Sequence, residues 1–371
     1  MSIVGTRPEL IKMCRVIALL DIQCRHILVH TGQNFDYALN EVFFHDLEIR
    51  APDYYLGAAG ETAIKTIADV LVKTAEVLEK EKPEAVLIYG DTNSGLAVIA
   101  AKRLKIPIFH MEAGNRCFDQ RVPEELNRKV IDHLSDVNMV LTEHARRYLI
   151  AEGLPQERII KVGSHMDEVL RHFMPRIMSS DVLTRLGLDQ GRFILVSSHR
   201  EENVDVEGNL RDLLASLNRL AETYGFPIVV STHPRTQQRL AALGDVLLDA
   251  SIRFLPPFGF LDYVRLQLAA ACVVSDSGTI TEEASLLGLR AVTIREAHER
   301  PEGMDEGTLV MCGLKPDAVL DAVRFVMASP DDDLAPARLV GDYAAGPVSR
   351  KIVGIVLSYI DYVNRVVWHQ P

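Results

Sequence analysis

Short apolar runs alternate with segments of helical periodicity along the whole chain. Such runs are typical of buried strands, and amphipathic segments between them are typical of helices that cover a parallel sheet. This alternation predicts an open α/β sheet in the first half, and its short first strand is a hint of an alternative start site or a trimmed terminus. The predicted strands are Ile3–Val4, Ile27–His30, Ala85–Tyr89, Ile106–Phe109 and Val137–Leu141, and the predicted helices are Pro8–Leu20, Glu61–Lys80 and Gly95–Arg103.

A second alternation of the same kind begins after the charged stretch 180–190. Two similar sheets predict two domains with a cleft between them, residues 1–167 and 168–351, joined around Met166–Ser179. The last apolar-periodic segment, Val348–Val366, predicts a C-terminal helix, about 352–371, that packs back onto the first domain. The predicted strands are Phe193–Ser197, Pro227–Ser231, Ile252–Leu255, Cys272–Ser275 and Ala291–Ile294, and the predicted helices are Val206–Thr223, Leu261–Ala270, Thr279–Leu287 and Pro316–Met327.

Composition narrows the function classes. The net charge of -11 over 371 residues argues against a general nucleic-acid binder, although it does not exclude local basic pockets for phosphate. The five cysteines are scattered and lack CxxC spacing, which is typical of reduced thiols and of neither a disulfide framework nor a zinc site. Charged residues interrupt every apolar segment before the roughly 18 residues of a membrane span, and no signal-peptide pattern is present. We therefore expect a cytoplasmic protein without a membrane partner.

The stretch 110–128, HMEAGNRCFDQRVPEELNR, concentrates charged residues directly after a predicted buried strand. The carboxyl edge of an open α/β sheet is where such folds bind ligands, and carboxylates beside cations there can have shifted pKa values suited to acid–base chemistry. A solvated loop with surface salt bridges is the commoner case for charged loops. We favour a site because similar clusters follow other strands. The charged residues are Glu112, Arg116, Asp119, Arg121, Glu124, Glu125 and Arg128.

Two further strand ends of the first domain carry candidate residues. Arg7 and Lys12 lie at the start of a predicted helix, where a cation pair and unpaired N–H groups can hold an anion. The alternative is a tight turn followed by a capped helix. Asp91 follows the third predicted strand in the same way, and on its own it would be read as a helix N-cap.

The second domain repeats this arrangement with histidines. His199 lies in SSHREEN after one predicted strand, and His233 lies in STHPR after the next. Histidine at these positions suits proton transfer or hydrogen bonding to phosphate. A lone histidine is usually structural, but two at equivalent strand ends favour a shared site.

The loop SDSGT followed by ITEE is the most ligand-like loop of the second domain. Its small residues Ser277, Gly278 and Thr279 allow close approach of a ligand, and the helix that follows can offer N–H groups to a diphosphate. Glu283, one turn later, can accept hydrogen bonds from a ribose diol. The alternative is an ordinary glycine turn with a Ser/Thr cap. The charged segment 295–307 that follows the last strand is a candidate substrate-facing wall.

Motifs for common cofactors are missing. No GxGxxG follows the first strand and no GxxxxGK[ST] occurs, which disfavours a dinucleotide oxidoreductase and a P-loop NTPase. No His/Cys/Asp arrangement has metal-ligand spacing. Metal-free chemistry on a nucleotide diphosphate ester therefore fits the residues best.

Taken together, these stretches resemble the UDP-N-acetylglucosamine 2-epimerase family. The motifs run in order from Gly5 to Leu314: GTRPELIK, TGQN, GDT, HMEAGNR, PEELNR, SHREEN, THP, SDSGTITEE and ERPEG. The resemblance implies two facing Rossmann-like domains, as in the B-type glycosyltransferases, with UDP bound by the second domain and usually a homodimer. It implies no nicotinamide cofactor and no required metal.

The implied reaction inverts C2 of a UDP-linked 2-acetamido sugar. Since no adjacent carbonyl acidifies that C–H bond, the family eliminates UDP to form a 2-acetamidoglycal and then adds UDP back after protonation of the other face. Which carboxylate takes the C2 proton stays open. By motif position, the resemblance implies catalytic roles for Asp91, Glu112, Glu124 and His199, and substrate contacts for Arg7, Lys12, Arg128, His233, Tyr263, Ser277, Gly278, Thr279 and Glu283.

Three departures from the usual family pattern bear on specificity. Asn34 stands in TGQN where many members have His, which weakens an inference of allosteric activation by UDP-N-acetylglucosamine. Thr279 stands where a second glycine is common. SHREEN and AHERPEGMDEG are similar to the branch that makes UDP-N-acetyl-L-fucosamine from its L-talosamine epimer for capsule and O-antigen synthesis.

Other functions compete with this prediction. A UDP-N-acetylglucosamine 2-epimerase that makes UDP-N-acetylmannosamine would be the common branch of the same family. A hydrolysing epimerase would release UDP and free sugar, and a B-type glycosyltransferase would use the same fold with an acceptor. A non-catalytic sensor is disfavoured because Asp91, Glu112, Glu124 and His199 are all present.

Overall fold

A computed structural model describes residues 1–33, 44–244, 247–297, 299–328 and 339–370. The chain divides into two compact units. Unit 1 comprises Met1–Arg171 and Asp342–Pro371, and unit 2 comprises His172–Gly341. The division falls inside one helix, α7 (His165–Met178). Each unit is a parallel α/β domain of its own.

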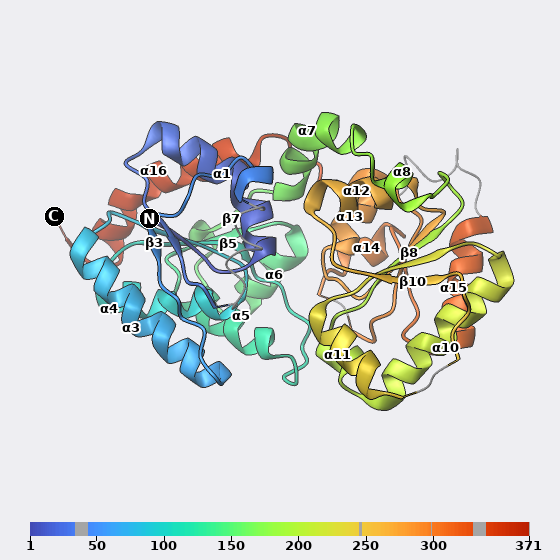
Figure 1. Cartoon of the computed structure of the whole chain (residues 1–371). Coiled ribbons are helices and arrows are strands. Elements are labelled where there is room, and N and C mark those ends of the chain that lie inside the picture. Colours follow the sequence, from blue (N-terminus) through green and yellow to red (C-terminus); the bar gives the residue numbers. More distant parts are fainter. Residues whose placement is uncertain (34–43, 245–246, 298, 329–338, 371) are drawn as a thin grey trace. The chain divides into compact units, whose positions relative to one another are not determined.

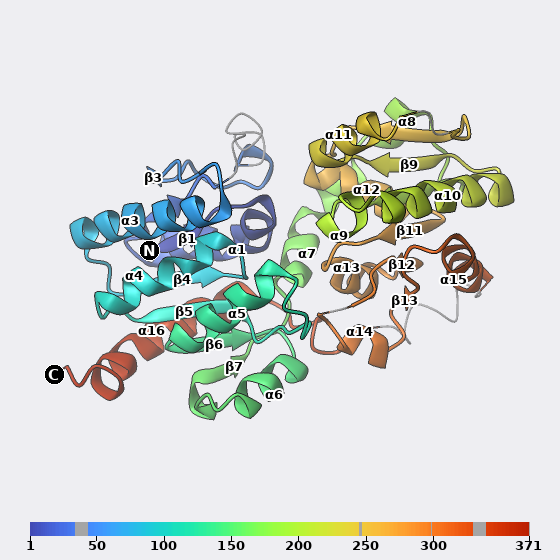
Figure 2. The ribbon, with the colours of Figure 1, turned by 90° about the horizontal axis from the view of Figure 1, so that it is seen from below.

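The described part of unit 1 contains a seven-stranded sheet in the order β3-β2-β1-β4-β5-β6-β7. All pairings are parallel, and Ile3 of β1 lies between Val29 of β2 and Ile88 of β4. Figure 2 shows β1, β4, β5, β6 and β7 following one another across the sheet. The strands are β1 (Ser2–Val4), β2 (Leu28–His30), β3 (Tyr54–Tyr55), β4 (Val86–Tyr89), β5 (Ile108–Ala113), β6 (Val137–Val140) and β7 (Ile159–Lys161).

Helices cover this sheet because their apolar faces and the buried strands form a common core. Val70 of α3 and Ile131 of α5, for example, lie in one buried cluster with Ile88. The C-terminal helix α16 packs beside α1 (Figure 1). The other bounds are α1 (Arg7–Gln23), α3 (Ala63–Glu81), η1 (Asn93–Ala97), α4 (Val98–Arg103), α5 (Pro123–Leu134), α6 (Glu143–Ala151), η2 (Gln156–Arg158) and α16 (Val348–Val366).

Unit 2 repeats the design. Its described residues form a six-stranded parallel sheet in the order β10-β9-β8-β11-β12-β13. The strands are β8 (Ile194–Ser197), β9 (Ile228–Ser231), β10 (Ile252–Leu255), β11 (Cys272–Ser275), β12 (Ala291–Thr293) and β13 (Val310–Met311). The helices are α8 (Val182–Leu186), α9 (Glu201–Val204), α10 (Glu207–Tyr224), α11 (Pro234–Ala242), α12 (Phe260–Ala269), α13 (Ile280–Leu287), α14 (Glu302–Asp305) and α15 (Pro316–Ala328).

Both strand orders are those of doubly wound Rossmann-like sheets. The direction of winding reverses between β1 and β4 in unit 1 and between β8 and β11 in unit 2. In such sheets the loops at the carboxyl ends of the strands beside the reversal point form the ligand site. None of the helices in the described ranges combines the length and hydrophobicity that a membrane crossing requires.

Candidate active site

The reversal point of unit 1 carries a buried ion pair. Lys12, in the second turn of α1, places Nζ 2.5 Å from Oε2 of Glu112 on β5. The side chains are only 4% and 11% exposed. The phenol of Tyr89, the last residue of β4, donates a hydrogen bond to the same carboxylate oxygen. The helix α1 and the neighbouring strands β4 and β5 thus bring together two residues expected from the sequence, Lys12 and Glu112, and one that was not, Tyr89.

The backbone of Glu112 is in an unusual conformation. Its φ is 61°, and the pairing of β5 with β6 shifts register between Met111 and Ala113, which makes this position a β-bulge. A left-handed conformation costs a non-glycine residue about 1–2 kcal/mol, and bulges commonly redirect a side chain near a site. The strain at Glu112 therefore serves to turn its carboxylate toward Lys12 and Tyr89.

A second ion pair, in which Arg128 is buried and Asp91 is partly exposed, lies at the same sheet edge. Nε of Arg128 on α5 is 2.8 Å from Oδ2 of Asp91, which follows β4. Nη1 of Arg128 is 3.0 Å from Oε2 of Glu125, whose carboxylate is fully buried. Backbone N–H groups of Cys117 and Phe118 also donate to Glu125. Burial favours a higher pKa for Glu125, but these hydrogen bonds and Arg128 outweigh it, and its pKa lies below the ordinary value.

Glu124 and Glu125 are adjacent in the first turn of α5 but differ in surroundings. Glu125 is 0% exposed, whereas Glu124 is partly exposed. The family resemblance implies a catalytic role for Glu124, which the structure leaves partly exposed. Glu125 instead holds the loop 117–118 and the guanidinium of Arg128.

Glu9 is a site neighbour that the sequence reasoning missed. Its side chain is buried, and its oxygens accept hydrogen bonds from the N–H of Gly5 at 2.5 Å and from Oγ1 of Thr92 at 2.6 Å. Burial raises the pKa of Glu9 to about 7 despite these donors. The residue ties the loop after β1 to the loop that carries Asp91. The spacing Thr6-x-x-Glu9, typical of a capping box, is the signal that could have found it.

Other charges of the stretch 110–128 stabilise the fold. Arg116 is buried and pairs with Asp132 at 2.7 Å and with Glu152 at 2.8 Å. Asp119 pairs with Arg121 at the surface, which lowers the pKa of Asp119 to about 2. The surface salt-bridge alternative weighed for this stretch thus applies to Asp119 and Arg121. Arg7, the first residue of α1, is partly exposed near the same edge.

In unit 2, Asp276 organises two loops at the reversal point. Its buried carboxylate accepts hydrogen bonds from the N–H groups of His199 and Arg200, both at 3.0 Å, and from Oγ of Ser198 at 2.9 Å. Nδ1 of His199 lies 3.2 Å from Oδ1 of Asp276, and the imidazole is 44% exposed. The loops after β8 and β11 are thereby joined. His233, which follows the next strand β9, is exposed.

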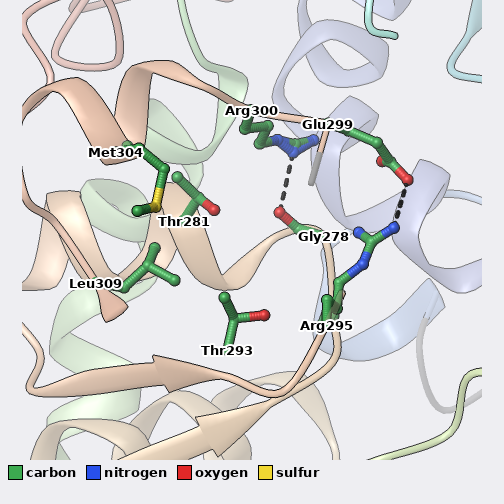
Figure 3. A pocket seen from close by; sticks show the side chains of 10 residues that line it. Gly278, Thr281, Thr293, Arg295, Glu299, Arg300, Met304 and Leu309 are labelled. Atoms are coloured by element: carbon green, nitrogen blue, oxygen red, sulfur yellow. Dashed lines mark hydrogen bonds and ion pairs between the residues drawn. The ribbon is translucent and has the colours of Figure 1, made fainter. Parts of the chain in front are cut away.

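Two arginines, Arg295 and Arg300, lie against the loop 277–279, which the sequence predicts to bind phosphate (Figure 3). Nη1 of Arg300 donates to the carbonyl of Gly278 at 3.1 Å, and Nη2 of Arg300 pairs with the buried Glu282 at 3.0 Å. Arg295 pairs with Glu299 at 2.9 Å beside the same turn. A Cβ added to Gly278 would lie 3.4–3.7 Å from Glu299, Arg295 and Arg200. Arg295, Glu299 and Arg300 of the charged segment therefore pack directly on this loop.

The residues predicted to contact the ribose and the uracil also lie close together. Glu283 on α13 accepts a hydrogen bond at 2.6 Å from Nε2 of Gln267 on α12, and both side chains are buried. Tyr263 lies one turn before Gln267, and burial together with the negative charge of Glu283 raises the pKa of its phenol. Ser277 and Thr279 are linked through their hydroxyls at 2.9 Å. Asn34 and His298, in two of the segments that depart from the family pattern, lie outside the described residues.

Comparisons with known proteins agree with this architecture. The model of the family described as UDP-N-acetylglucosamine 2-epimerase matches residues 20–357. A solved structure of UDP-N-acetylglucosamine 2-epimerase from Rickettsia bellii is 60% identical, covers 100% of this chain and 99% of its own, and has a TM-score of 0.92. The UDP-2,3-diacetamido-2,3-dideoxy-D-glucuronate 2-epimerase of Pseudomonas aeruginosa is 36% identical over 90% of this chain and 93% of its own.

Two further solved structures identify the fold class. The Methanocaldococcus jannaschii UDP-GlcNAc 2-epimerase in complex with UDP-GlcNAc and UDP is 30% identical, covers 96% of this chain and 99% of its own, and has a TM-score of 0.88. A glycotransferase of kitacinnamycin, 12% identical with a TM-score of 0.61, shows the fold alone. The prediction of two parallel α/β domains of the B-type glycosyltransferase class is confirmed. The chain therefore belongs to the UDP-N-acetylglucosamine 2-epimerase family of isomerases.

Proposed function

We propose that this protein interconverts the two C2 epimers of a UDP-linked 2-acetamido sugar without net hydrolysis. The observation that carries the proposal is the pair of carboxylate–cation contacts at one sheet edge, Glu112 with Lys12 and Asp91 with Arg128. In a member of this family, such groups supply both a proton acceptor and positive charge for a leaving diphosphate.

The chemistry proceeds by elimination and re-addition. A carboxylate takes the proton from C2, the C–H electron pair forms a C1–C2 double bond, and the C1–O bond breaks to release UDP. A proton then returns to the other face of C2, and UDP adds back at C1. We assign proton transfer to Asp91, Glu112 and Glu124, with His199 beside the reacting sugar. The remaining contacts are assigned to Arg7, Lys12, Arg128 and His233 for substrate and diphosphate, Ser277, Gly278 and Thr279 for phosphate, Glu283 for ribose and Tyr263 for uracil.

The deciding experiment uses solvent deuterium. Incubation with the UDP-sugar in D2O, followed by proton NMR, should show deuterium at C2 of the product epimer, because the abstracted proton exchanges with solvent before C2 is protonated again. Epimerisation with full retention of the C2 proton would refute the elimination route.

The same assay separates the alternative activities. A hydrolysing epimerase would accumulate UDP and free sugar, and a glycosyltransferase would release UDP only when an acceptor is added. We expect neither, because the proposed reaction returns UDP to the sugar. Stoichiometric release of UDP with free sugar would show that the protein is a hydrolysing epimerase.

For the substrate, we propose the 6-deoxy pair UDP-N-acetyl-L-talosamine and UDP-N-acetyl-L-fucosamine, used for capsule or O-antigen synthesis. The support is that the departures from the usual pattern, SHREEN and AHERPEGMDEG, fall on segments beside the loop at Gly278, whereas the GTRPE and GDT loops are ordinary. The relative from Pseudomonas aeruginosa carries the name of a different UDP-sugar, so members of the family are named for more than one sugar.

Specificity is tested by comparing kcat/KM on three UDP-sugars. We expect a preference of several powers of ten for the 6-deoxy pair over UDP-N-acetylglucosamine, since an unpaired buried polar group discriminates strongly. A comparable kcat/KM on UDP-N-acetylglucosamine would favour the common branch, and a preference for the diacetamido-glucuronate would favour the activity for which the Pseudomonas aeruginosa relative is named.

We also propose a cytoplasmic homodimer. The free cysteines at the described positions are consistent with a reducing compartment. Light scattering of the purified protein tests the dimer, and cell fractionation tests the location.

A further inference from the structure

Tyr89 contacts both Glu112 and Lys12 in unit 1, although its position in the sequence indicates only a strand residue. It ends β4 and is 4% exposed. Its hydroxyl donates to Oε2 of Glu112, the oxygen that also lies 2.5 Å from Nζ of Lys12. One carboxylate oxygen thus receives both a phenol and an ammonium.

The ring of Tyr89 is itself held on two sides. Nζ of Lys12 lies 5.5 Å from its ring centroid, within the range of a cation–π contact. The imidazole of His165, on α7, meets the ring edge-on with centroids 5.3 Å apart and an interplanar angle of 74°. The direction of the hydroxyl is therefore determined by packing from α1 and α7.

Glu112 depends on such partners for its orientation. Its backbone φ of 61° lies at a bulge, where the regular alternation of the strand no longer dictates the side-chain direction. Its other oxygen, Oε1, has Nδ2 of Asn115 at 3.5 Å, the limit of a hydrogen bond. The contacts at Oε2 are thus the shorter constraints on the carboxylate.

We propose that Tyr89 is a positioning residue that, together with Lys12, fixes the carboxylate of Glu112 in the orientation needed for proton transfer at C2. The inference rests on the proposed epimerase function and adds to it a residue that neither the motifs nor the comparisons assign. Proton transfer requires the acceptor within hydrogen-bond distance of the proton, so a carboxylate free to rotate would lose turnover more than substrate affinity.

The chain offers a matched control. Tyr54 on β3 donates its hydroxyl to Glu81 at 2.5 Å, and Nζ of Lys80 lies 5.0 Å from the centre of its ring. This second tyrosine–glutamate–lysine cluster lies at the end of α3, which leads into the amino end of β4. Tyr54→Phe removes the same hydroxyl at the opposite sheet edge.

The experiment compares Tyr89→Phe with Tyr54→Phe. Loss of one hydrogen bond to a charged group should lower kcat of Tyr89→Phe about 10- to 100-fold. KM and the Kd for UDP should stay within about twofold, because the ring and its contacts remain. Tyr54→Phe should keep wild-type kcat. Wild-type kcat in Tyr89→Phe, or an equal loss in both variants, would overturn the inference.

A double variant distinguishes positioning from general structural support. If Tyr89 acts through Glu112, adding Tyr89→Phe to Glu112→Gln should reduce kcat no further, whereas independent effects would multiply. A crystal structure of Tyr89→Phe should show Glu112 in more than one rotamer, and a single unchanged rotamer would count against the inference. This structural measurement stands even if the wild-type enzyme fails the D2O assay, which would refute the epimerase mechanism alone.

Discussion

Nζ of Lys12 and Oε2 of Glu112 are 2.5 Å apart, although 100 positions separate the two residues in the chain. Both side chains are nearly buried, so each charge depends on the other. Removal of one partner from a buried pair typically costs about 3–5 kcal/mol, because the remaining charge is left without compensation. The contact joins the first helix of unit 1 to the bulge of β5, and so it links a residue proposed to bind substrate to the proposed acid–base group.

Replacement of Lys12 tests this contact. We expect Lys12→Met to lower turnover about 100-fold or more, as for Glu112→Gln, because both variants remove the same functional unit. A matched control is Lys102→Met, since Nζ of Lys102 also lies 2.5 Å from a buried carboxylate, that of Asp136, which precedes β6. The control should lose stability and keep kcat. Wild-type turnover in folded Lys12→Met would contradict the assignment.

The adjacent residues Glu124 and Glu125 should respond in opposite ways. Glu124→Gln should lower turnover about 100-fold with little change in melting temperature, as expected for loss of an acid–base group. Glu125→Gln should mainly lower the melting temperature, because Glu125 is buried and pairs with Arg128 at 3.0 Å. Steady-state kinetics and thermal unfolding of both variants provide the test. A catalytic defect only in Glu125→Gln would shift the assignment by one residue.

Central strands were predictable because they are buried on both faces and read as continuous apolar runs. Each predicted strand in both halves is present. The edge strands β3 (Tyr54–Tyr55), β7 (Ile159–Lys161) and β13 (Val310–Met311) were not predicted. They are two or three residues long and partly exposed, so their sequences lack the apolar run that burial imposes.

The candidate site was predictable where charge follows an apolar run, as at Lys12, Asp91 and Glu112. Its supporting residues were not. In the sequence, Tyr89 is only one residue of a predicted strand and Gln267 only one residue of a predicted helix. The tertiary fold brings Tyr89 to Glu112 and Gln267 to Glu283. Partnerships across so many positions leave no local pattern in one sequence.

Gln267 should influence nucleotide binding through Glu283. Its Nε2 donates to Glu283 at 2.6 Å, so Gln267→Leu removes a buried donor and should weaken UDP binding by about tenfold, with kcat little changed. Glu283→Ala should weaken binding at least as much. Titration calorimetry with UDP measures both. Gln190→Leu, at an exposed position of the same unit, is the control. Unchanged affinity in Gln267→Leu would contradict the role of Glu283 in ribose binding.

His30 should make unit 1 less stable in acid. The imidazole is buried and stacks on Tyr55 with centroids 5.3 Å apart, and its Nδ1 accepts the N–H of Gly32 at 3.1 Å. Burial lowers the pKa of His30 from 6.5 to about 4. Between these values the unfolded chain binds more protons, so stability present above pH 6.5 is lost as the pH falls. From pH 7 to 5 the loss should be about 2 kcal/mol.

Tryptophan fluorescence reports the unfolding of unit 1, because the single tryptophan of the chain, Trp368, belongs to that unit. Urea unfolding followed by its fluorescence should show a smaller difference between pH 7 and pH 5 in His30→Gln than in the wild type. His45→Gln removes a histidine that is 89% exposed and should leave the difference unchanged. An equal acid sensitivity in His30→Gln and the wild type would show that His30 does not govern the acid stability of unit 1.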